Sequence, residues 1–292
     1  MQTWSRRNAA MLDRYLVSGY QNPRINIQSI LVRHVLVSKL FGSELDHLAN
    51  EEIRFAVELN EMLRRRALEL GVTMGSFLDP EKHAAVRRVE EVIADRQTAF
   101  EDRWNNVVSE RSAGSISVLE FACGSANDYR AFFGYGLAPH LDYTGVDLTP
   151  KNIENALRRF PEVRFEVGDI LDLRYADGSF DFVIASDIFE HLGLDEMERA
   201  LGEACRLARR GVVLTFFNMS GAPDHVVQRK RAYHWNRLSA PLIEEYLRRH
   251  FRTVTTVPVA TWLQDRFGYS HSYNRYAYTI VAANDEAVPG RA

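Results

Sequence analysis

The stretch Val118-Leu-Glu-Phe-Ala-Cys-Gly124-Ser-Ala-Asn127 decides the fold. It begins as a short apolar run, passes through a turn of small residues and leads into a helical pattern. Small side chains let a ligand approach the backbone closely, and the free N–H groups at a helix start favour a carboxylate or phosphate. The stretch therefore predicts a ligand-binding crevice at the carboxyl end of a buried strand.

Strands and helices alternate on the C-terminal side of this stretch, which predicts a parallel sheet with helices on both faces, an α/β fold. The tail departs from the alternation, because two strands there are separated only by an irregular loop, and such a connection predicts an antiparallel hairpin at the sheet edge. The expected strands are 116–121, 142–147, 163–167, 180–185, 212–217, 253–259 and 276–283. Helices are expected near 127–137, 150–160, 197–208 and 239–250.

On the N-terminal side, residues 1–112 have a helical pattern throughout. One amphipathic helix is expected to start at Ser43 and end before Gly71, a second begins with Asp79 as its N-cap and Pro80 at the first position, and an earlier one covers 29–40. The small polar segment 111–115 is typical of a junction between domains. We therefore expect a helical region over 1–112 and an α/β domain over 113–292.

Composition excludes several classes of protein. The 292 residues include 46% hydrophobic and 26% charged residues, which is the globular average. A net charge of −3, from 36 basic and 39 acidic residues, gives no field to hold a polyanion, so nucleic acid is an unlikely partner. The two cysteines, Cys123 and Cys205, cannot build a disulfide framework. With no apolar signal segment at the N-terminus, the expectation is a cytoplasmic protein without membrane association.

Acidic residues stand where three of the strands end. Asp147 closes the second strand and is placed to accept hydrogen bonds from the two hydroxyls of a ribose. Asp169 and Ile170 follow the third strand, where they could take an exocyclic amine and one ring face. The fourth strand runs into Ser186-Asp-Ile-Phe-Glu-His191, the titratable cluster of the crevice. Taken alone, Asp147 and Asp169 could each simply cap a turn.

These motifs, in this order, resemble the class I S-adenosylmethionine-dependent methyltransferases, particularly the ubiquinone- and menaquinone-biosynthesis group. The resemblance covers about residues 114–284, through 118–125, 144–147, 168–170 and 180–186. It implies a Rossmann-like seven-stranded sheet with an antiparallel last strand, and S-adenosylmethionine as the cofactor. Glu120 and Gly124 would hold the methionine portion, Asp147 the ribose, and Asp169 and Ile170 the adenine. The cofactor-binding set that it implies is completed by Phe121, Asn127, Leu148 and Ser186.

The first motif departs from the family at two positions, because Ala122 and Ala126 stand where glycine is usual. Both replacements crowd the turn slightly, which leaves open a non-catalytic binding module on a methyltransferase fold. The same residues exclude the G-x-G-x-x-G run of a dinucleotide-binding protein. Neither a phosphate loop nor a serine-hydrolase elbow occurs in the sequence.

Methyl transfer to an alcohol or ammonium requires a base, and three residues are candidates for it. His191 follows the fourth strand, and Tyr233 and His234 lie in the long segment 218–236, which we expect to form a wall of the substrate pocket. Asp187, Glu190 and His191 also resemble the metal motif of small-RNA 2′-O-methyltransferases, although they need no metal as a helix-start sequence. We predict no metal site, a small polar metabolite as the acceptor of the methyl group on oxygen or nitrogen, and a metal-assisted RNA methyltransferase as the alternative.

The resemblance does not cover the helical region at the N-terminus. About 112 residues precede the α/β domain, more than this fold usually carries there. Because these helices are amphipathic, they must bury their apolar stripes on one another, on the α/β domain or on a second subunit. We expect either a cap that closes the acceptor site and sets substrate choice, or the interface of a homodimer.

Overall fold

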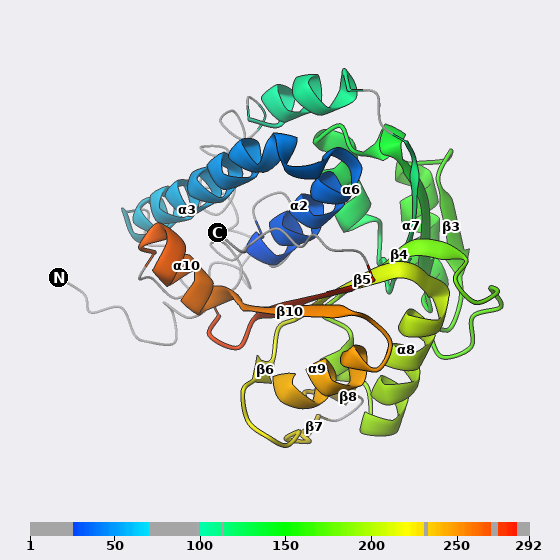
Figure 1. Ribbon diagram of the computed structural model, residues 1–292. Helices are drawn as coiled ribbons and strands as arrows, with labels where there is room; N and C mark the ends of the chain where they lie inside the picture. The colour runs from blue at the N-terminus through cyan, green and yellow to red at the C-terminus, as the bar shows by residue number, and fades with distance from the viewer. Residues whose placement is uncertain are drawn as a thin grey trace, which may run out of the picture.

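The computed structural model describes residues 26–69, 98, 100–111, 114–230, 233–269 and 274–284. A seven-stranded sheet in the order β10-β11-β5-β4-β1-β2-β3 runs through its centre (Figure 1). Strands β1 to β5 pair in parallel with their neighbours, and β11 lies antiparallel between β5 and β10. The strands are β1 (Ile116–Phe121), β2 (Leu141–Asp147), β3 (Arg164–Val167), β4 (Phe180–Ser186), β5 (Ala208–Phe216), β10 (Thr253–Pro258) and β11 (Tyr278–Ala283). This arrangement confirms the predicted α/β sheet with its antiparallel last strand.

Helices cover both faces of the sheet, which explains why the central strands β1 and β4 are buried along nearly their whole length. On one face, α8 (Leu194–Leu207) and α9 (Ala240–Arg248) bury Met197, Leu201 and Ile243 against β4 and β5. On the other face lie α6 (Asn127–Gly134), α7 (Pro150–Arg159) and the helices that precede the sheet in the chain. The two layers are visible above and below the sheet in Figure 1. The sheet is therefore buried on both sides, and ligands can approach it only along its edges.

The helical region before the sheet packs onto it. Helix α2 (Ile27–Phe41) starts at Asn26, whose side chain accepts hydrogen bonds from the N–H groups of Gln28 and Ser29. Its residues Leu36 and Val37 share one apolar core with Trp104 and with side chains of β1, β5 and β11. Residues on both sides of segment 111–115 therefore contribute to a single core.

The next helix begins slightly later than the sequence predicts. A turn of 3-10 helix covers Gly42–Leu45, and α3 then runs from Asp46 to Glu69. Residues 98 and 100–109 are helical, as the second amphipathic pattern predicts. The start of that pattern at Asp79, and the expected stop at Gly71, lie outside the described residues.

One element of the tail contradicts the sequence prediction. Helix α10 (Val259–Phe267) lies between β10 and β11, where only an irregular loop was expected. It begins after Pro258, ends at Gly268 with φ of 65°, and buries Val259 and Leu263. The antiparallel pairing is nevertheless as predicted, because antiparallel strands can be joined by any connection that reverses the chain. Helix α10 rests beside α3 at one end of the molecule (Figure 1).

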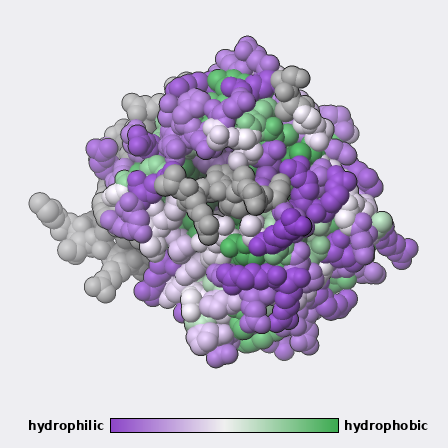
Figure 2. Space-filling model, in the orientation of Figure 1, coloured by the Kyte–Doolittle hydropathy of each residue, from purple (hydrophilic) through white to green (hydrophobic). Residues whose placement is uncertain are grey.

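The molecular surface is mostly polar. Figure 2 shows charged and polar side chains over this face, with apolar ones scattered between them. Among the described helices, none has an apolar stretch of the length that a bilayer crossing requires.

Candidate functional site

The turn after β1 is shaped by three residues with left-handed backbone conformations. Ala122, Gly124 and Ala126 have φ values of 53°, 55° and 63°. The N–H of Cys123 donates to the Val146 carbonyl at 3.0 Å, which fastens the turn to β2. Space is open around the position where Gly124 would carry a Cβ. The turn therefore keeps the tight shape that the sequence predicts, with alanine carrying two conformations that glycine adopts more easily.

Substituting Ala122 by glycine should stabilise the protein. A left-handed conformation costs a non-glycine residue roughly 1–2 kcal/mol, and glycine removes this cost. The greater conformational freedom of glycine in the unfolded chain offsets about 0.4–1 kcal/mol of that gain in stability. The free energy of unfolding in urea should rise by about 0.5–1 kcal/mol for Ala122→Gly. Ala176→Gly, at an exposed loop position without a positive φ, should lower it instead. A loss of stability in Ala122→Gly would show that the turn is not strained.

Asp147 joins the ends of β1 and β2. Its Oδ2 accepts a hydrogen bond from the Gly124 N–H at 3.0 Å. Its Oδ1 accepts from the Thr149 N–H at 2.8 Å and from the Asn152 side-chain amide at 3.0 Å. The side chain is buried, so these contacts are sheltered from water. Asp147 therefore holds the local turns, and its carboxylate lies at the carboxyl edge of the sheet, where the resemblance expects the ribose.

Two further carboxylates are buried behind this turn. Glu120 accepts a hydrogen bond from the Tyr143 hydroxyl at 2.5 Å, and burial together with the charge of Asp128 raises the pKa of Glu120 well above its usual range. Asp128 accepts hydrogen bonds from the hydroxyls of Ser29 and Ser186, each at 3.0 Å. Burial raises its pKa too, although both serines and the charge of Arg33 oppose the shift.

A second acidic pair lies where β4 ends. Asp187 has a φ of 53° and accepts a hydrogen bond from the Thr215 hydroxyl at 3.2 Å. Glu190 is fully buried; its Oε1 accepts from the Phe217 N–H at 2.7 Å, and its Oε2 has no hydrogen-bond partner. Burial raises the pKa of both carboxyl groups, and the charge of Glu190 adds to the shift at Asp187. The carboxyl edge of the sheet therefore carries more buried acid than it neutralises, an arrangement that favours a cationic ligand.

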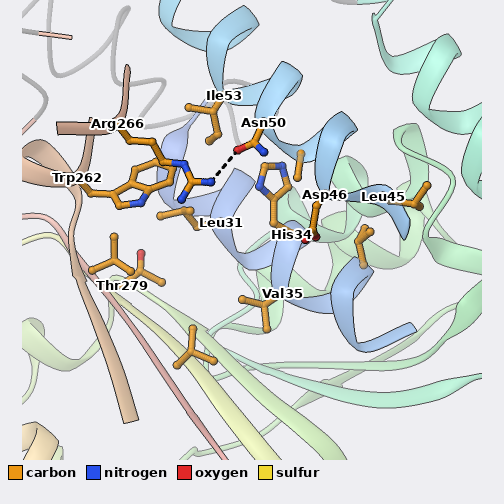
Figure 3. Close-up of a pocket in the computed structure, with 14 residues that line it drawn as sticks. Leu31, His34, Val35, Leu45, Asp46, Asn50, Ile53, Trp262, Arg266 and Thr279 are labelled. Carbon is orange, nitrogen blue, oxygen red and sulfur yellow. Dashed lines mark hydrogen bonds between the residues drawn. The ribbon is translucent and has the colours of Figure 1, made fainter. Parts of the chain in front are cut away.

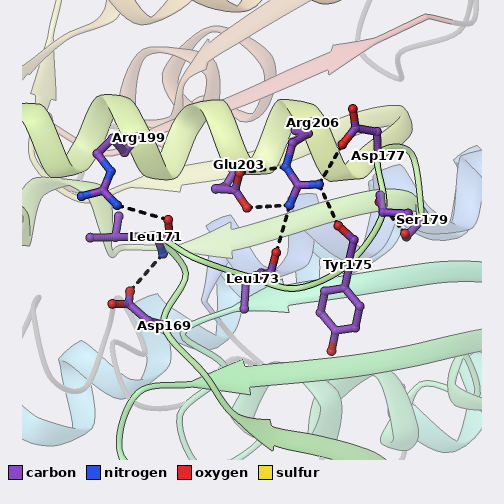
Figure 4. A network of polar contacts seen from close by, with 10 residues as sticks. Asp169, Leu171, Leu173, Tyr175, Asp177, Ser179, Arg199, Glu203 and Arg206 are labelled. Atoms are coloured by element: carbon purple, nitrogen blue, oxygen red, sulfur yellow. Dashed lines mark hydrogen bonds and ion pairs between the residues drawn. The ribbon is translucent and has the colours of Figure 1, made fainter.

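The loop after β3 is anchored by arginines of α8 (Figure 4). The Arg206 guanidinium donates to the carbonyls of Leu173 and Tyr175 at 3.0 and 2.7 Å, and it also pairs with Asp177 and Glu203. Arg199 donates to the Leu171 carbonyl at 3.4 Å. Asp169, at the start of this loop, is exposed and accepts from the Leu171 N–H at 2.9 Å, while Ile170 is buried in the core. Helix α8 thus fixes the loop that the sequence assigns to the adenine.

If the loop after β3 holds the adenine, as the resemblance implies, substituting Arg206 by methionine should weaken cofactor binding without affecting the transfer step. Losing the contacts to the loop carbonyls should raise the KM for S-adenosylmethionine about three- to tenfold, or roughly 0.7–1.4 kcal/mol, with kcat unchanged. Arg249→Met is the matched control, because Arg249 lies directly after α9, is exposed and pairs with the exposed Glu245. An unchanged KM in Arg206→Met would mean that the loop needs no support from α8.

Two of the three predicted base candidates, His191 and Tyr233, have their rings together beside Glu190, and the third, His234, contacts His191 through its main chain. The His191 ring lies 5.7 Å from the Tyr233 ring and 5.2 Å from the Trp235 ring, measured between centroids. His191 Nδ1 is 3.3 Å from the His234 carbonyl oxygen. His234 Nδ1 is buried and has no hydrogen-bond partner, whereas Tyr233 is half exposed. Short strands shape this segment: β6 (Met219–Ser220), β7 (Arg229–Lys230), β8 (Tyr233–His234) and β9 (Leu238–Ser239).

The remaining predicted residues differ in what their side chains can do. Leu148, next to Asp147, is 69% exposed, so an apolar side chain is open to a ligand there. Asn127 is exposed and accepts from Arg159 at 3.3 Å. Phe121 is fully buried in the core, so only its backbone can face a ligand.

Sequence reasoning missed Asp128, Ser29 and Gln28. Asp128 lies in the first turn of α6, directly after the motif turn, and this position is the sequence feature that could have marked it as a site residue. Ser29 and Gln28 belong to α2, about 100 residues earlier in the chain. Gln28 donates to the carbonyls of Phe216 and Tyr278 at 3.1 and 3.0 Å, so the start of α2 is tied to the same edge.

Comparison with known proteins agrees with this geometry. Residues 119–216 match the family model described as a methyltransferase domain. Demethylmenaquinone methyltransferase of Thermotoga maritima is 33% identical over 113 residues, 38% of this chain and 48% of that protein. Norajmaline N-methyltransferase of Rauvolfia serpentina is 26% identical over 151 residues, 48% of this chain and 47% of that protein. The chain spans about half the length of the curated relatives that it matches.

Among solved structures, an S-adenosylmethionine-dependent methyltransferase of Methanosarcina mazei is 14% identical, covers 58% of this chain and 92% of its own, and has a TM-score of 0.45. The match over 119–216 identifies a methyltransferase domain in this part of the chain, and the sheet order is the one that the resemblance to class I S-adenosylmethionine-dependent methyltransferases predicts. That resemblance implies S-adenosylmethionine as the cofactor.

The residues present fit that cofactor. S-adenosylmethionine carries a sulfonium and an ammonium group, and the carboxyl edge offers buried acids in excess together with an open turn at Gly124. The exposed Leu148 offers an apolar surface beside Asp147. Within the part of the chain that the structure describes, no three side chains of His, Cys, Asp or Glu come together as metal ligands.

Proposed function

We propose that the protein transfers a methyl group from S-adenosylmethionine to an oxygen or nitrogen atom of a small polar metabolite. The observation that carries the proposal is the meeting of two groups at one edge of the sheet: the acids around Asp147 and the cluster of His191, Tyr233 and His234. The first group suits the cofactor and the second suits an acceptor that must lose a proton. One relative is named as an N-methyltransferase, which supports keeping nitrogen among the acceptor atoms.

The bound cofactor supplies a methyl group activated by its positively charged sulfur. Asp147 would accept hydrogen bonds from the ribose, Glu120 and the Gly124 turn would hold the methionine portion, and the Arg206-supported loop would hold the adenine. The residues of the chain therefore align two reactants and exclude water. The rings of Phe217, Trp235 and His191 would form the wall against which the acceptor rests.

The base would come from the histidines in this wall. His191 lies in the 3-10 turn Phe189–His191, directly after β4, and His234 has an unpartnered ring nitrogen. A base within hydrogen-bond reach of the acceptor contributes about 10²–10⁴-fold to the rate. Tyr233 would close the wall on the solvent side, since half of its surface is exposed.

Removing either histidine should lower turnover and leave cofactor binding nearly unchanged. In the proposal, His191→Ala and His234→Ala each reduce kcat by about a hundredfold or more, while calorimetry shows the same affinity for S-adenosylmethionine. Acceptors would first be found by incubating a panel of phenols and amines with methyl-labelled S-adenosylmethionine. His250→Ala, on an exposed position after α9, is the control. If both variants keep full turnover, alignment alone accounts for catalysis.

The start of α2 would close the acceptor side of the site. Gln28 and Ser29 reach the carboxyl edge, and most of α2 is buried on the sheet of its own chain. This burial supports the cap, rather than a homodimer interface, as the role of α2.

A further inference from the structure

Residues 226–230 and 233–237 form two antiparallel arms in the segment that carries the proposed acceptor wall. Strands β7 and β8 pair at one end of the arms. At the other end, the backbones of Val226 and Arg237 donate a hydrogen bond to each other in the same register, each at 2.9 Å. Both arms are therefore extended, and every second side chain of an arm points to the same side.

One side of the second arm carries Tyr233, Trp235 and Arg237. The rings of Tyr233 and Trp235 both lie against His191, at centroid distances of 5.7 and 5.2 Å. The Trp235 ring also lies 6.3 Å from the Phe217 ring, which completes the proposed wall. Arg237 is the next side chain along this side of the arm, so its guanidinium borders the wall.

The Arg237 side chain is oriented by two uncharged groups. Its Nε donates to Asn218 Oδ1 at 3.3 Å, and the Asn218 side chain is itself buried and donates to the Asn236 carbonyl at 2.9 Å. The guanidinium carbon lies 3.9 Å from the centroid of the Tyr276 ring. Within the part of the chain that the structure describes, no carboxylate pairs with Arg237, so the N–H groups of both its terminal nitrogens are available to a ligand.

A second arginine shares the same ring. The guanidinium carbon of Arg275 lies 4.7 Å from the Tyr276 ring centroid, and one terminal nitrogen donates to the Tyr276 hydroxyl at 2.5 Å. Arg275 is exposed, and among the described residues it too has no carboxylate partner. Two guanidinium groups beside one ring repel each other, and an anion bound by both would offset the repulsion.

The loop of Arg275 is tied to the acceptor wall. The Asn274 side-chain amide donates to the Phe217 carbonyl at 2.6 Å, and the Met219 N–H donates to the Tyr276 carbonyl at 2.8 Å. Both contacts lie where β5 ends. The two arginines and the aromatic wall are therefore parts of one structure at the carboxyl end of β5.

Arg266 shows the opposite situation. It lines an apolar cavity between α2, α3, α10 and the β10–β11 edge of the sheet (Figure 3). Its guanidinium donates to Asn50 Oδ1 at 3.4 Å and has a further interaction partner, so it is committed within the protein. Arg237 and Arg275 have only the contacts given above, and each keeps N–H groups that can bind a ligand.

We propose a substrate class that rests on the proposed function: the acceptor is a small aromatic acid, and Arg237 and Arg275 bind its carboxylate. The ring would stack among Phe217, Trp235 and His191, since aromatic rings pack favourably on one another. The carboxylate would accept two hydrogen bonds from the terminal nitrogens of Arg237, a geometry that guanidinium groups favour, and Arg275 would add its charge.

The carboxylate takes no part in the transfer itself. A lone pair on the hydroxyl oxygen or amine nitrogen of the acceptor forms the bond to the methyl carbon, and the electrons of the breaking carbon–sulfur bond stay on sulfur. The proton of the acceptor passes to His191. The two arginines act by holding the ring in one orientation, which keeps the reacting atom in place.

The test measures binding of 4-hydroxybenzoate to the full-length protein by calorimetry, with and without S-adenosylhomocysteine. 4-Hydroxybenzyl alcohol and 4-hydroxybenzylamine are neutral and cationic probes of the same shape. We expect 4-hydroxybenzoate to bind with a Kd of about 1 mM or below. The two other probes should bind at least about tenfold more weakly, because neither can pair with the guanidinium charges.

Substitutions locate the probe. Arg237→Met should weaken binding of 4-hydroxybenzoate about tenfold and leave 4-hydroxybenzyl alcohol unchanged, because methionine keeps an apolar stem and removes the charge. Arg275→Met should weaken the benzoate about threefold, since its exposed charge is screened by water. Arg252→Met is the matched control: Arg252 is exposed and precedes β10, at the end of the sheet where β5 begins. Thermal unfolding verifies that each variant is folded.

Three binding results would overturn the assignment of the acceptor: no binding of 4-hydroxybenzoate, equal affinities for the benzoate and the alcohol, or an unchanged benzoate affinity in Arg237→Met. Incubation of the probes with methyl-labelled S-adenosylmethionine separates this assignment from the proposed function. Labelled benzoate whose kcat/KM falls about tenfold in Arg237→Met supports both.

The remaining outcomes of the labelling experiment differ in what they overturn. Methylation of the alcohol and the benzoate with equal kcat/KM, in the native protein and in Arg237→Met, keeps the proposed function and overturns the acidic acceptor. Charge-dependent binding at Arg237 with no labelled product from any probe leaves an anion site alone. The proposed function then fails, and the acidic acceptor fails with it.

Discussion

Asp147→Ala is expected to abolish measurable binding of S-adenosylmethionine. The carboxylate would bind the ribose hydroxyls, and it also holds the Gly124 turn and the start of α7 through three hydrogen bonds. Hydrogen bonds to a charged group contribute about 1.5–3 kcal/mol each, so losing the ribose contacts together with the turn should lower affinity at least ~100-fold. Isothermal titration calorimetry should show micromolar binding to the native protein and no heat for the variant.

A control separates binding from folding in this experiment. Asp142 is exposed near the start of β2, at the far end of the same strand, and Asp142→Ala should bind the cofactor normally. Asp147→Asn keeps the size of the side chain, so it should fold closer to the native protein and still bind weakly. If the native protein produces no heat with S-adenosylmethionine, the enzymatic proposal fails and a non-catalytic module takes its place. If Asp147→Ala binds normally, the ribose lies elsewhere.

Glu52→Ala should be the most destabilising substitution among those considered. Glu52 is buried between Arg33 and His34, at 2.5 and 2.6 Å. Burial alone would raise the pKa of Glu52, but the charge of Arg33 and the contact with His34 outweigh it and hold the pKa of Glu52 below its usual range. Removing Glu52 takes away the carboxylate that pairs with the buried Arg33 guanidinium, and breaking a buried ion pair typically costs about 3–5 kcal/mol. Urea denaturation should show a loss of this size in the free energy of unfolding.

The neighbouring residue gives the matched control. Glu51 pairs with Arg103 at 2.9 Å on the surface, where both side chains are about half exposed, so Glu51→Ala should cost less than about 1 kcal/mol. Because the pKa of Glu52 is depressed in the folded protein, its stabilisation should be present at neutral pH. It should be lost as the pH falls through that folded-state pKa. Equal losses in the two variants would show that the buried pair contributes no more than the exposed one.

The sheet could be predicted from the sequence because its strands carry their own signals. β1 and β4 are short apolar runs bounded by small or polar residues, and each is buried along nearly its full length. The place of Asp147 at the carboxyl edge could be predicted because one helix and one strand separate it in sequence from the Gly124 turn. Helix α10 could not, since only Val259 and Leu263 are buried and two positions do not establish a helical period.

Contacts between distant parts of the chain were beyond sequence reasoning. Ser29 meets Asp128 across 99 positions, and Gln28 meets Phe216 across 188. No local pattern marks a serine or glutamine in an amphipathic helix as part of a site, because the same residues are ordinary on any helix. The packing of α2 on the sheet decides their role. The strain at Ala122 and Ala126 was likewise visible only as a departure from glycine.

The acids at the carboxyl edge have a consequence for the reaction cycle. Glu120, Asp128, Asp187 and Glu190 all have raised pKa values in the free protein, so they hold protons more tightly than exposed acids do. A cation bound beside them lowers those pKa values, and its binding therefore releases protons and strengthens as the pH rises. In the proposed reaction the cofactor would lose its positive charge on sulfur. The acids at the edge would then take protons back, so the spent cofactor would be held less tightly than a fresh, charged one.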